Sequence, residues 1–399
     1  MNHEKTHPWI KFRLDLNHAQ PNVFWLKLGE IKSKCVHIAQ APLLPTVAKY
    51  IHRIYLAKGV IGTTAIEGNT LTTDDALQVI DGKDLALPQS KDYLRLEITN
   101  VIDASNDLLN SVVLKQKSLD ISVDLIKSFN AHILKDIDVG KDVIPGEIRT
   151  HQVVVGNYKP PEAGDCEYLL NKLCDWLKDS DFSLGKGEEI ATGVLKAIVA
   201  HLYIAWIHPF GDGNGRTARL LELAILLSAG VPSAAAHLLS NYYNETRERY
   251  YRALENASRD REKGEFNFIE YALVGLTEQL VSQLEDIQQQ QMQIVWINFI
   301  HKSFSGKKSI ALDRQKLLIL DLAESGKYEP ITKGEVRVVS KRIEQLYREK
   351  TDKTIARDLN ALKEMKLLTE KEKGTYVMNM REHLLTMIPP SIQDIPFPL

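Results

Sequence analysis

The chain has 399 residues, of which 44% are hydrophobic and 26% charged, and its formal net charge at pH 7 is −2. These proportions are those of globular proteins, and the length leaves room for about two or three domains. A nearly neutral chain has no gross attraction to nucleic acid or to an anionic membrane, which excludes purely electrostatic binding of either by the whole molecule.

The cysteines and the N-terminus indicate the compartment. Cys35, Cys166 and Cys174 do not have metal-site spacing, and we expect them to be free thiols in a reducing environment. Residues 1–16 contain no apolar run of the signal-peptide kind, and no stretch of the sequence suggests a membrane span. The sequence therefore predicts a cytoplasmic protein without a membrane partner.

A glutamate stands near the end of the first predicted helix, where a negative charge is unusual. Residues 1–45 show no clear period, whereas from Pro45 apolar residues recur on one helical face toward Gly62. Glu67 and Gly68 then have the pattern of a last helical turn and its glycine cap. Because a helix C-terminus favours cations, the carboxylate of Glu67 indicates a partner elsewhere in the fold.

Helices are also predicted at residues 74–80, 93–109 and 123–134, where apolar residues recur at intervals of three and four. Thr72 and Asp75 have the spacing of an N-cap with an acidic first turn, so the nearby acids serve as cap charges. We expect these helices to supply the walls of a bundle and no chemistry.

A break in the helical pattern follows at residues 145–161. Gln152 and three valines precede the turn pair Gly156-Asn157, which predicts a short β-hairpin. An isolated hairpin among helices is marginally stable, which suggests that it has a function.

The most informative stretch, residues 208–219, reads H-P-F-G-D-G-N-G-R-T-A-R. Its three glycines let the backbone approach a phosphate, and the following helix, expected to begin near Asn214, adds the positive end of its dipole. An amphipathic helix at 188–206 precedes the stretch. His201 lies on the apolar side of this helix, where a hydrogen-bonded structural histidine fits better than a metal ligand.

The charged residues of the stretch suit a nucleotide triphosphate. Arg216 and Arg219 share one helical face and offer two guanidinium forks to successive phosphates. Asp212 is a hard oxygen ligand of the kind that Mg2+ uses together with phosphate oxygens. His208 is the natural general base.

A long amphipathic helix is predicted at 268–287, and its glutamine-rich end is a solvated helical run or a linker. The sequence pattern changes after this point. Helices at 317–322, 336–347 and 354–363 precede a two-stranded wing at 367–377, an order that resembles a winged helix-turn-helix. The proline-rich residues 388–399 are expected to be extended.

The charge of this tail leaves its partner open. Residues 331–381 contain 13 lysines and arginines against 8 acidic residues, which permits phosphate contacts by Lys353, Arg357 and Lys363. The acids are interleaved with these cations, so protein contacts are an equal alternative.

Residues 208–219 carry every fixed position of the signature H-P-F-x-D-G-N-G-R-x-x-R, and the chain thereby resembles the Fic family. This family typically moves AMP from ATP to a hydroxyl side chain of a target protein and releases pyrophosphate. The resemblance covers residues 45–290 well and the tail loosely. It implies ATP as substrate, Mg2+ as cofactor and a protein as partner.

The resemblance also implies roles for individual residues. His208 is similar to the base that deprotonates the target hydroxyl, and Asp212 to the Mg2+ ligand. Arg216 and Arg219 correspond to the contacts of the β- and γ-phosphates. The ATP-binding residues implied are Val154, Val155, Gly156, Asn157, Asp212, Gly213, Asn214, Gly215, Arg216, Thr217, Arg219, Tyr250 and Tyr251.

Three segments outside the signature gain a role in this way. Residues 63–68 fit the pattern [S/T]-x-x-x-E-[G/N] of an inhibitory segment, in which Glu67 would pair with Arg219 and deny it to the γ-phosphate. The hairpin resembles the family's flap, whose edge would hold the target in extended form. The tyrosine pair would contact the nucleoside, although Ser258 stands where relatives often have asparagine.

The expected fold class is mainly α: a Fic-type helical bundle with a β-hairpin flap, plus a small α/β winged helix-turn-helix domain. Residues 1–110 would form an N-terminal helical region, 111–290 the catalytic core and 300–385 the winged helix. The predicted function is protein adenylyl transfer, autoinhibited by Glu67. Removal of AMP, or both activities, is the alternative within the enzyme class, and a DNA-binding regulator that senses nucleotide is the second. Homodimer formation is left open.

Overall fold

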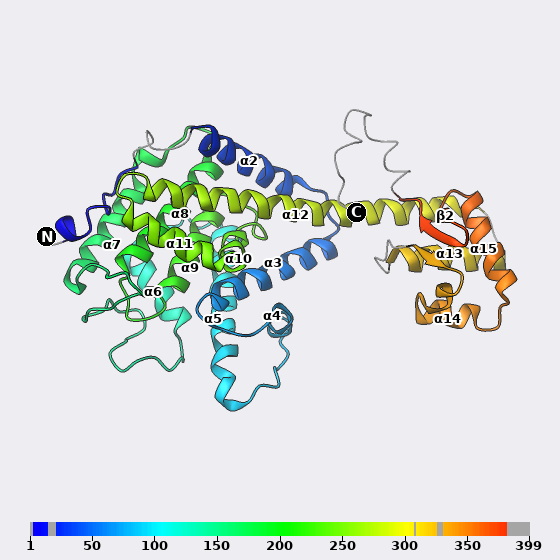
Figure 1. The fold of residues 1–399 in the computed structure, drawn as a ribbon, viewed down its shortest axis with the longest axis horizontal. Helices are drawn as coiled ribbons and strands as arrows, with labels where there is room; N and C mark the ends of the chain where they lie inside the picture. Colours follow the sequence, from blue (N-terminus) through cyan, green and yellow to red (C-terminus); the bar gives the residue numbers. More distant parts are fainter. Residues whose placement is uncertain (1–2, 15–20, 307–308, 325–329, 381–399) are drawn as a thin grey trace. The chain divides into compact units, whose positions relative to one another are not determined.

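The computed structural model describes residues 3–14, 21–306, 309–324 and 330–380. Within these residues the fold is mainly helical with one small sheet, as the predicted fold class requires (Figure 1). It divides into two compact units, Met1–Leu284 and Glu285–Leu399, and the dividing point lies inside the long helix α12. The further subdivision near residue 110 stays a prediction.

The first unit begins with a series of surrounding helices. They are α1 (His3–Thr6), α2 (Pro21–Gln40), α3 (Pro45–Ala65), α4 (Thr73–Ile80), η2 (Gln89–Lys91), α5 (Asp92–Leu108), the π-helical η3 (Leu109–Leu114) and α6 (Val123–Ile133). The helices predicted between residues 45 and 134 are therefore present. Thr72 and Asp75 form a reciprocal capping box at the start of α4.

Helix α2 lies in the region to which the sequence assigned no element. Its buried residues Phe24, Leu28, Ile31 and Cys35 recur every three or four positions and form one face. Proline is favoured at the first position of a helix, so Pro21 marks the start of α2 and does not interrupt it.

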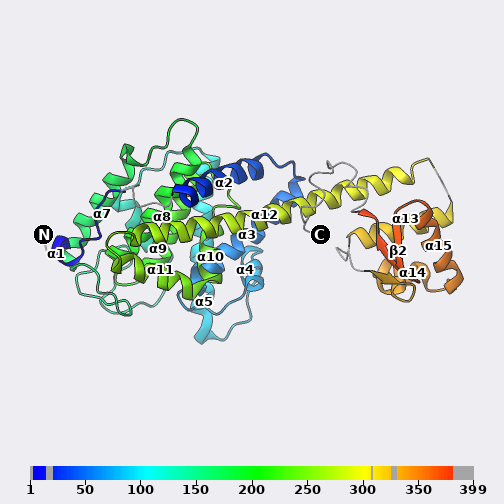
Figure 2. The same ribbon diagram turned by 45° about the horizontal axis from the view of Figure 1, so that its top comes forward.

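The core of this unit is a pair of buried helices. The later helices are α7 (Ala163–Lys178), η4 (Ser180–Phe182), α8 (Glu189–Ile207), α9 (Asn214–Ser228), α10 (Leu238–Glu245), α11 (Arg247–Arg259) and α12 (Gly264–Ser303). Helices α8 and α9 pack on each other, with α2, α7 and α11 against α8 and with α3, α5 and α6 against α9 (Figures 1 and 2). The loop that joins α8 to α9 is thus held from several sides.

Helix α8 corrects one expectation. Contrary to the expectation that no stretch suggests a membrane span, Glu189–Ile207 is long and apolar enough to cross a bilayer, and it is the one such helix in the described part of the chain. In the fold, 78% of that window is buried inside the unit, as in a core helix.

The predicted hairpin is smaller than expected. Val155 and Tyr158 exchange two backbone hydrogen bonds of 2.9 Å around the turn at Gly156-Asn157, whose glycine has a φ of 57°. This single bridge is isolated, and no strand ladder extends from it in residues 145–161. The prediction of a β-hairpin is therefore correct for the turn and wrong for the strands, since two short arms without a third strand gain little from pairing.

The second unit contains the C-terminal part of α12, three further helices and a sheet. Its other elements are α13 (Ile310–Glu324), β1 (Ile331–Thr332), η5 (Glu335–Val338), α14 (Lys341–Tyr347), α15 (Asp352–Glu364), β2 (Leu368–Glu372) and β3 (Thr375–Met378). The strands are antiparallel in the order β1-β3-β2, with Ile331 opposite Tyr376. The predicted two-stranded wing and the helices predicted at 317–322 and 354–363 are present, and β1 is an unpredicted third strand. The helix predicted at 336–347 is divided into η5 and α14, because Ser340 caps the start of α14.

A separate apolar core holds the second unit together. Trp296 and Ile300 of α12 pack with Leu318, Leu359 and Tyr376, among other buried residues. The glutamine-rich run of α12 continues the helix and is not a break, consistent with the good helix propensity of glutamine. The predicted extended residues 388–399 lie outside the described part of the chain.

Candidate active site

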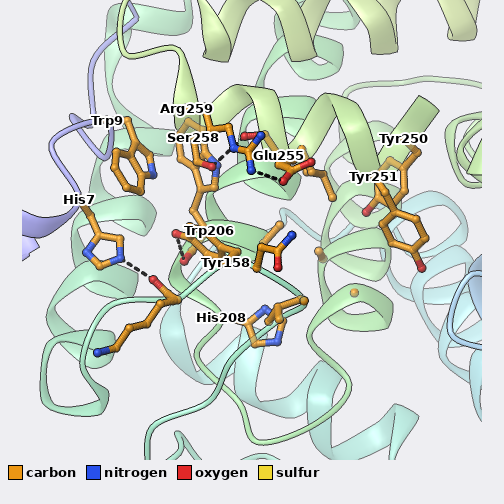
Figure 3. A pocket seen from close by; sticks show the side chains of 18 of the residues that line it. His7, Trp9, Tyr158, Trp206, His208, Tyr250, Tyr251, Glu255, Ser258 and Arg259 are labelled. Carbon is orange, nitrogen blue, oxygen red and sulfur yellow. Dashed lines mark hydrogen bonds and ion pairs between the residues drawn. The ribbon is translucent and has the colours of Figure 1, made fainter. Parts of the chain in front are cut away.

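The loop between α8 and α9 carries the charged residues of the signature. His208 caps α8 in the left-handed conformation, with φ 48° and ψ 59°, and its amide still donates to Ile204 O at 2.9 Å. This turn ends the buried helix and leaves the imidazole partly exposed on a cavity of about 850 Å³ (Figure 3). The cavity lies in the first unit.

Burial sets the protonation of His208. Desolvation lowers the pKa of its imidazole from the usual 6.5 to about 4, and the nearby positive charge of Arg149 acts in the same direction. The ring is therefore neutral near pH 7 and can accept a proton.

Two buried asparagines brace the loop. The amide of Asn214 accepts from Phe210 N at 2.9 Å and donates to Phe210 O at 2.8 Å, so this side chain is occupied within the loop. Asn130 of α6 donates to Asp212 O at 2.9 Å and to Thr217 Oγ1 at 3.2 Å. The contribution of Asn130 was not predicted, because it lies 82 residues from Asp212 and no local spacing indicates it.

The carboxylate of Glu67 lies against the first turn of α9. Gly213 has a φ of 76°, which favours glycine, and it precedes the first turn of the helix. A side chain at Gly215 would collide with the carboxylate of Glu67, which lies against this turn. The inhibitory candidate thus occupies a helix N-terminus, a place that favours an anion such as a phosphate.

Glu67 also binds Arg219, as the resemblance implied. Arg219 is 2% exposed, and its Nη2 donates to Glu67 Oε1 and to Thr63 O, the latter at 3.0 Å. Burial alone would raise the pKa of Glu67, but the Arg219 guanidinium outweighs it and brings that pKa below the usual value. The Nε and Nη1 atoms of Arg219 are buried without a hydrogen-bond partner among the described residues.

Arg216 has a carboxylate of its own. Its Nη1 donates to Glu97 Oε1 of α5 at 2.7 Å, and its Nη2 lies 3.4 Å from Asp212 Oδ1. Asn69, just beyond Glu67, donates to Glu97 Oε2 at 2.8 Å. Segment 63–70 therefore reaches both arginines of the signature. It contacts Arg219 directly, as expected, and it contacts Arg216 through Glu97, a link that the sequence did not predict.

The tyrosine pair is anchored at both hydroxyls. Tyr250 is buried and shares a hydrogen bond of 2.9 Å with His201 Nε2, which confirms the expectation of a hydrogen-bonded structural histidine. Tyr251 donates to Ile66 O at 2.9 Å, which links α11 to the segment that carries Glu67. Both rings line the cavity.

The flap is attached to the loop by one buried arginine. Arg149 donates to His208 O at 2.8 Å, to His151 O at 2.9 Å and to Pro161 O at 2.6 Å. Its guanidinium thus joins both ends of the flap to the backbone of the candidate base.

Only some of the predicted site residues line the cavity. Of the predicted residues, those that line it are Glu67, Val155, Gly156, Asn157, His208, Gly215, Tyr250 and Tyr251. Val154 is 66% exposed and does not line it. The others, Asp212, Gly213, Asn214, Arg216, Thr217 and Arg219, lie on the loop or in the first turns of α9 outside this lining.

A magnesium ion would have one carboxylate ligand here. In the described residues no three His, Cys, Asp or Glu side chains cluster as a complete metal site. The Asp212 side chain is 48% exposed, with Oδ1 near Arg216 and hydrogen-bonded to Gly213 N. A single accessible carboxylate fits a Mg2+ ion that takes its other ligands from phosphates and water.

Comparison with known proteins agrees with this geometry. Residues 120–226 match the model of the Fic/DOC family. The chain is 30% identical over 232 residues to protein adenylyltransferase fic-1 of Caenorhabditis briggsae, a match that covers 57% of this chain and 41% of the relative. It is 34% identical over 196 residues to protein adenylyltransferase Fic of Nematostella vectensis, covering 49% of this chain and 42% of that protein. The matches thus span about two fifths of these curated relatives.

Solved structures share the fold. Fic-1 (residues 134 to 508) of Caenorhabditis elegans has a TM-score of 0.53 and 23% identity, over 67% of this chain and 73% of that one. A Fic family protein of Desulfovibrio desulfuricans G20 has a TM-score of 0.51 and 19% identity, over 89% of this chain and 94% of that one. At these identities the likeness shows the fold alone.

Proposed function

We propose that this chain, whose residues 120–226 form a Fic/DOC family domain, transfers AMP from ATP to a hydroxyl side chain of a target protein. The observation that carries the proposal is the position of the His208 imidazole on the same cavity as the N-terminus of α9, and its lowered pKa favours the neutral form that a base needs. A base and an anion site on one cavity are what nucleotidyl transfer to a hydroxyl requires. The names of the relatives support the same reaction.

The proposed reaction is an in-line displacement. The hydroxyl oxygen of the target bonds to the α-phosphorus, the bond from that phosphorus to the bridging oxygen breaks, and pyrophosphate leaves. His208 accepts the hydroxyl proton at its imidazole. The backbone amides at the start of α9 would stabilise negative charge on the phosphates. Mg2+ held by Asp212 would add positive charge at those oxygens.

The same site would be held inactive by Glu67. Its carboxylate lies at the helix N-terminus and on Arg219, both of which ATP phosphates would need. Glu97 holds Arg216 in the same way. Productive binding of ATP therefore requires both arginines to exchange a carboxylate for a phosphate.

Removal of AMP is a second candidate for the same site. Glu67 is 34% exposed on the cavity and lies near enough to His208 for each to influence the pKa of the other. A carboxylate in that place could orient a water molecule toward an AMP-modified side chain. Release of AMP from a modified target that depends on Glu67 would show this direction.

For the second unit we propose a winged helix that contacts protein. Its helices and hairpin follow the order of that fold, but two of its cations are already paired, Arg337 with Asp352 and Lys363 with Glu370. Salt-dependent binding of duplex DNA that disappears without residues 309–399 would favour a DNA partner instead.

The three buried free cysteines support a cytoplasmic location for the protein.

The test uses labelled nucleotide. The Glu67→Gly protein is incubated with ATP labelled at the α-phosphate and with a cell lysate, and the labelled proteins are identified. We expect labelled bands that are absent with γ-labelled ATP and absent from the Glu67→Gly, His208→Ala double variant, because general-base catalysis is worth about a hundred- to ten-thousandfold. Equal labelling by the double variant would overturn the assignment of His208.

A further inference from the structure

The N-terminal strap, residues 3–14, closes one side of the cavity and is not explained by the reaction chemistry. Thr6, His7 and Trp9 belong to the lining of the cavity. Figure 3 shows His7 and Trp9 on the side opposite Tyr250 and Tyr251. The strap therefore forms a wall of the site from a segment far from the signature in sequence.

The strap is fixed at both sides of the cavity. His7 Nε2 lies 2.9 Å from Lys159 O at the end of the flap, and Lys11 Nζ donates to Arg261 O, beyond α11, at 3.0 Å. Phe12 packs beside Tyr203 of α8, with ring centroids 5.3 Å apart. The strap thus spans from the flap to the end of α11, and its position is held by named contacts.

The wall that it forms is aromatic. Trp9 lies 5.1 Å from His7 and 6.4 Å from Tyr158, measured between ring centroids. Trp206 of α8 lines the same part of the cavity, and the hydroxyl of Tyr158 donates to Trp206 O at 2.8 Å. Planar rings of this kind are suited to stacking or edge contact with a planar ligand.

The lining of the cavity contains two kinds of group that a nucleotide needs. Gly215 and Glu67 bring the N-terminus of α9 to its surface, and this helix terminus suits phosphate. The rings of Trp9, Tyr158 and Trp206, which lie among the cations Lys159, Arg259 and Arg261, suit a nucleobase.

We propose that the N-terminal strap is part of the nucleotide-binding site and that Trp9 contacts the base of the bound nucleotide. The inference rests on the proposed function for the identity of the ligand. It adds a binding residue that belongs neither to the signature nor to the flap. A strap that only braced the flap would affect phosphate and base alike, whereas a base contact affects only ligands that carry a base.

The experiment measures binding by calorimetry in the full-length Glu67→Gly protein, which serves as parent. Mg·ATP and Mg·tripolyphosphate are titrated into the parent and into its Trp9→Ala, Trp9→Phe and Trp25→Ala derivatives. Trp25, on α2, is 42% exposed and outside the cavity, so it is the matched tryptophan control.

We expect Trp9→Ala to raise the Kd for Mg·ATP by about tenfold, the size of one base–aromatic stacking contact. Its Kd for tripolyphosphate should equal that of the parent, and Trp9→Phe and Trp25→Ala should bind both ligands like the parent. An unchanged Kd for ATP, or an equal loss for both ligands, overturns the proposal.

A second measurement does not depend on how a variant folds. The parent is irradiated with an azido-adenine ATP, and the labelled peptides are mapped. Cross-links within residues 3–14 support the proposal, and cross-links confined to other segments overturn it. A parent that binds ATP but transfers no AMP would sink the proposed function and leave the base contact standing, whereas a parent that binds no ATP overturns both.

Discussion

Both units of the molecule contain buried arginines that are paired with carboxylates, and the pair of Arg219 with Glu67 differs from the pair of Arg314 with Asp358. In the second unit Asp358 is fully buried and accepts from Arg314 at 2.6 and 2.9 Å, from Gln315 at 2.9 Å and from Tyr347 at 3.1 Å. In the first unit Glu67 has Arg219 as its charged partner, and about a third of its side chain is open to the cavity.

The difference lies in what remains unsatisfied. Two nitrogens of Arg219 are buried without a partner, whereas no side-chain nitrogen of Arg314 is so placed. A buried charge pair is most stable when further hydrogen bonds complete both groups. The pair of Arg314 therefore has the features of a structural element. The pair of Arg219 has unused donors and an accessible partner, which suit exchange for another anion.

The largest expected effect is on stability, in the second unit. Asp358→Asn leaves the Arg314 charge buried without compensation, and we expect a loss of about 3–5 kcal/mol in the unfolding free energy of that unit. Hydrogen exchange of α15 peptides at increasing urea concentrations measures it. Asp352→Asn is the control, since this side chain is 82% exposed and pairs only at the surface. Equal stability of the two variants would contradict the comparison.

The next effect is on activity, in the first unit. Glu67→Gly frees Arg219 and the N-terminus of α9, and we expect AMP transfer to rise about ten- to hundredfold, the value of one or two charge-assisted hydrogen bonds to phosphate. Initial rates with labelled ATP measure it. The hydrogen exchange of the first unit should change much less than that of the second unit in Asp358→Asn. An unchanged or lower rate would argue against inhibition by Glu67.

A smaller effect is expected from the link to the second arginine. Asn69→Ala removes hydrogen bonds of 2.8 Å to Glu97 and 2.9 Å to Leu94 O, and it loosens the segment that carries Glu67. We expect a rise of about fivefold in basal AMP transfer, since one such bond is worth about 1 kcal/mol. Asn171→Ala on the exposed side of α7 is the control. A rise as large as that of Glu67→Gly would show that the segment, and not the carboxylate, holds the site closed.

The smallest effect concerns pH. The pKa of Glu67 is lowered below 4.5, so its pairing with Arg219 is complete above that value and is lost only as the pH falls through the lowered pKa. The ratio of the Glu67→Gly rate to the unmodified rate should thus be constant from pH 5.5 to 8. A ratio that falls toward one within this window would mean that Glu67 becomes protonated there.

The sequence predicted the local parts of the site well. The start of α9 and the cap of α4 follow from residues close together in the chain, whereas the approach of the glycine backbone to a phosphate stays a prediction. The contact between Glu67 and Arg219 was expected from the resemblance, and the structure contains it. Its inhibitory role stays a prediction.

Contacts between distant residues could not be predicted in the same way. Glu97 lies 119 residues from Arg216, and His7 lies 152 residues from Lys159, so no spacing connects them. In the flap, the sequence predicted a strand that the structure does not contain. The three valines favour a strand, but the fold provides no neighbouring strand for them. Tertiary packing, and not local preference, decided both cases.

The position of Arg149 has a consequence for how a substrate could be sensed. The guanidinium of Arg149 donates to the carbonyl groups of His151, Pro161 and His208, so one side chain connects the flap to the peptide of the proposed base. If a target docks along the flap as proposed, a displacement of the flap would be transmitted through Arg149 to the backbone of His208, the proposed base. Binding of the target protein and orientation of the His208 imidazole would then be coupled.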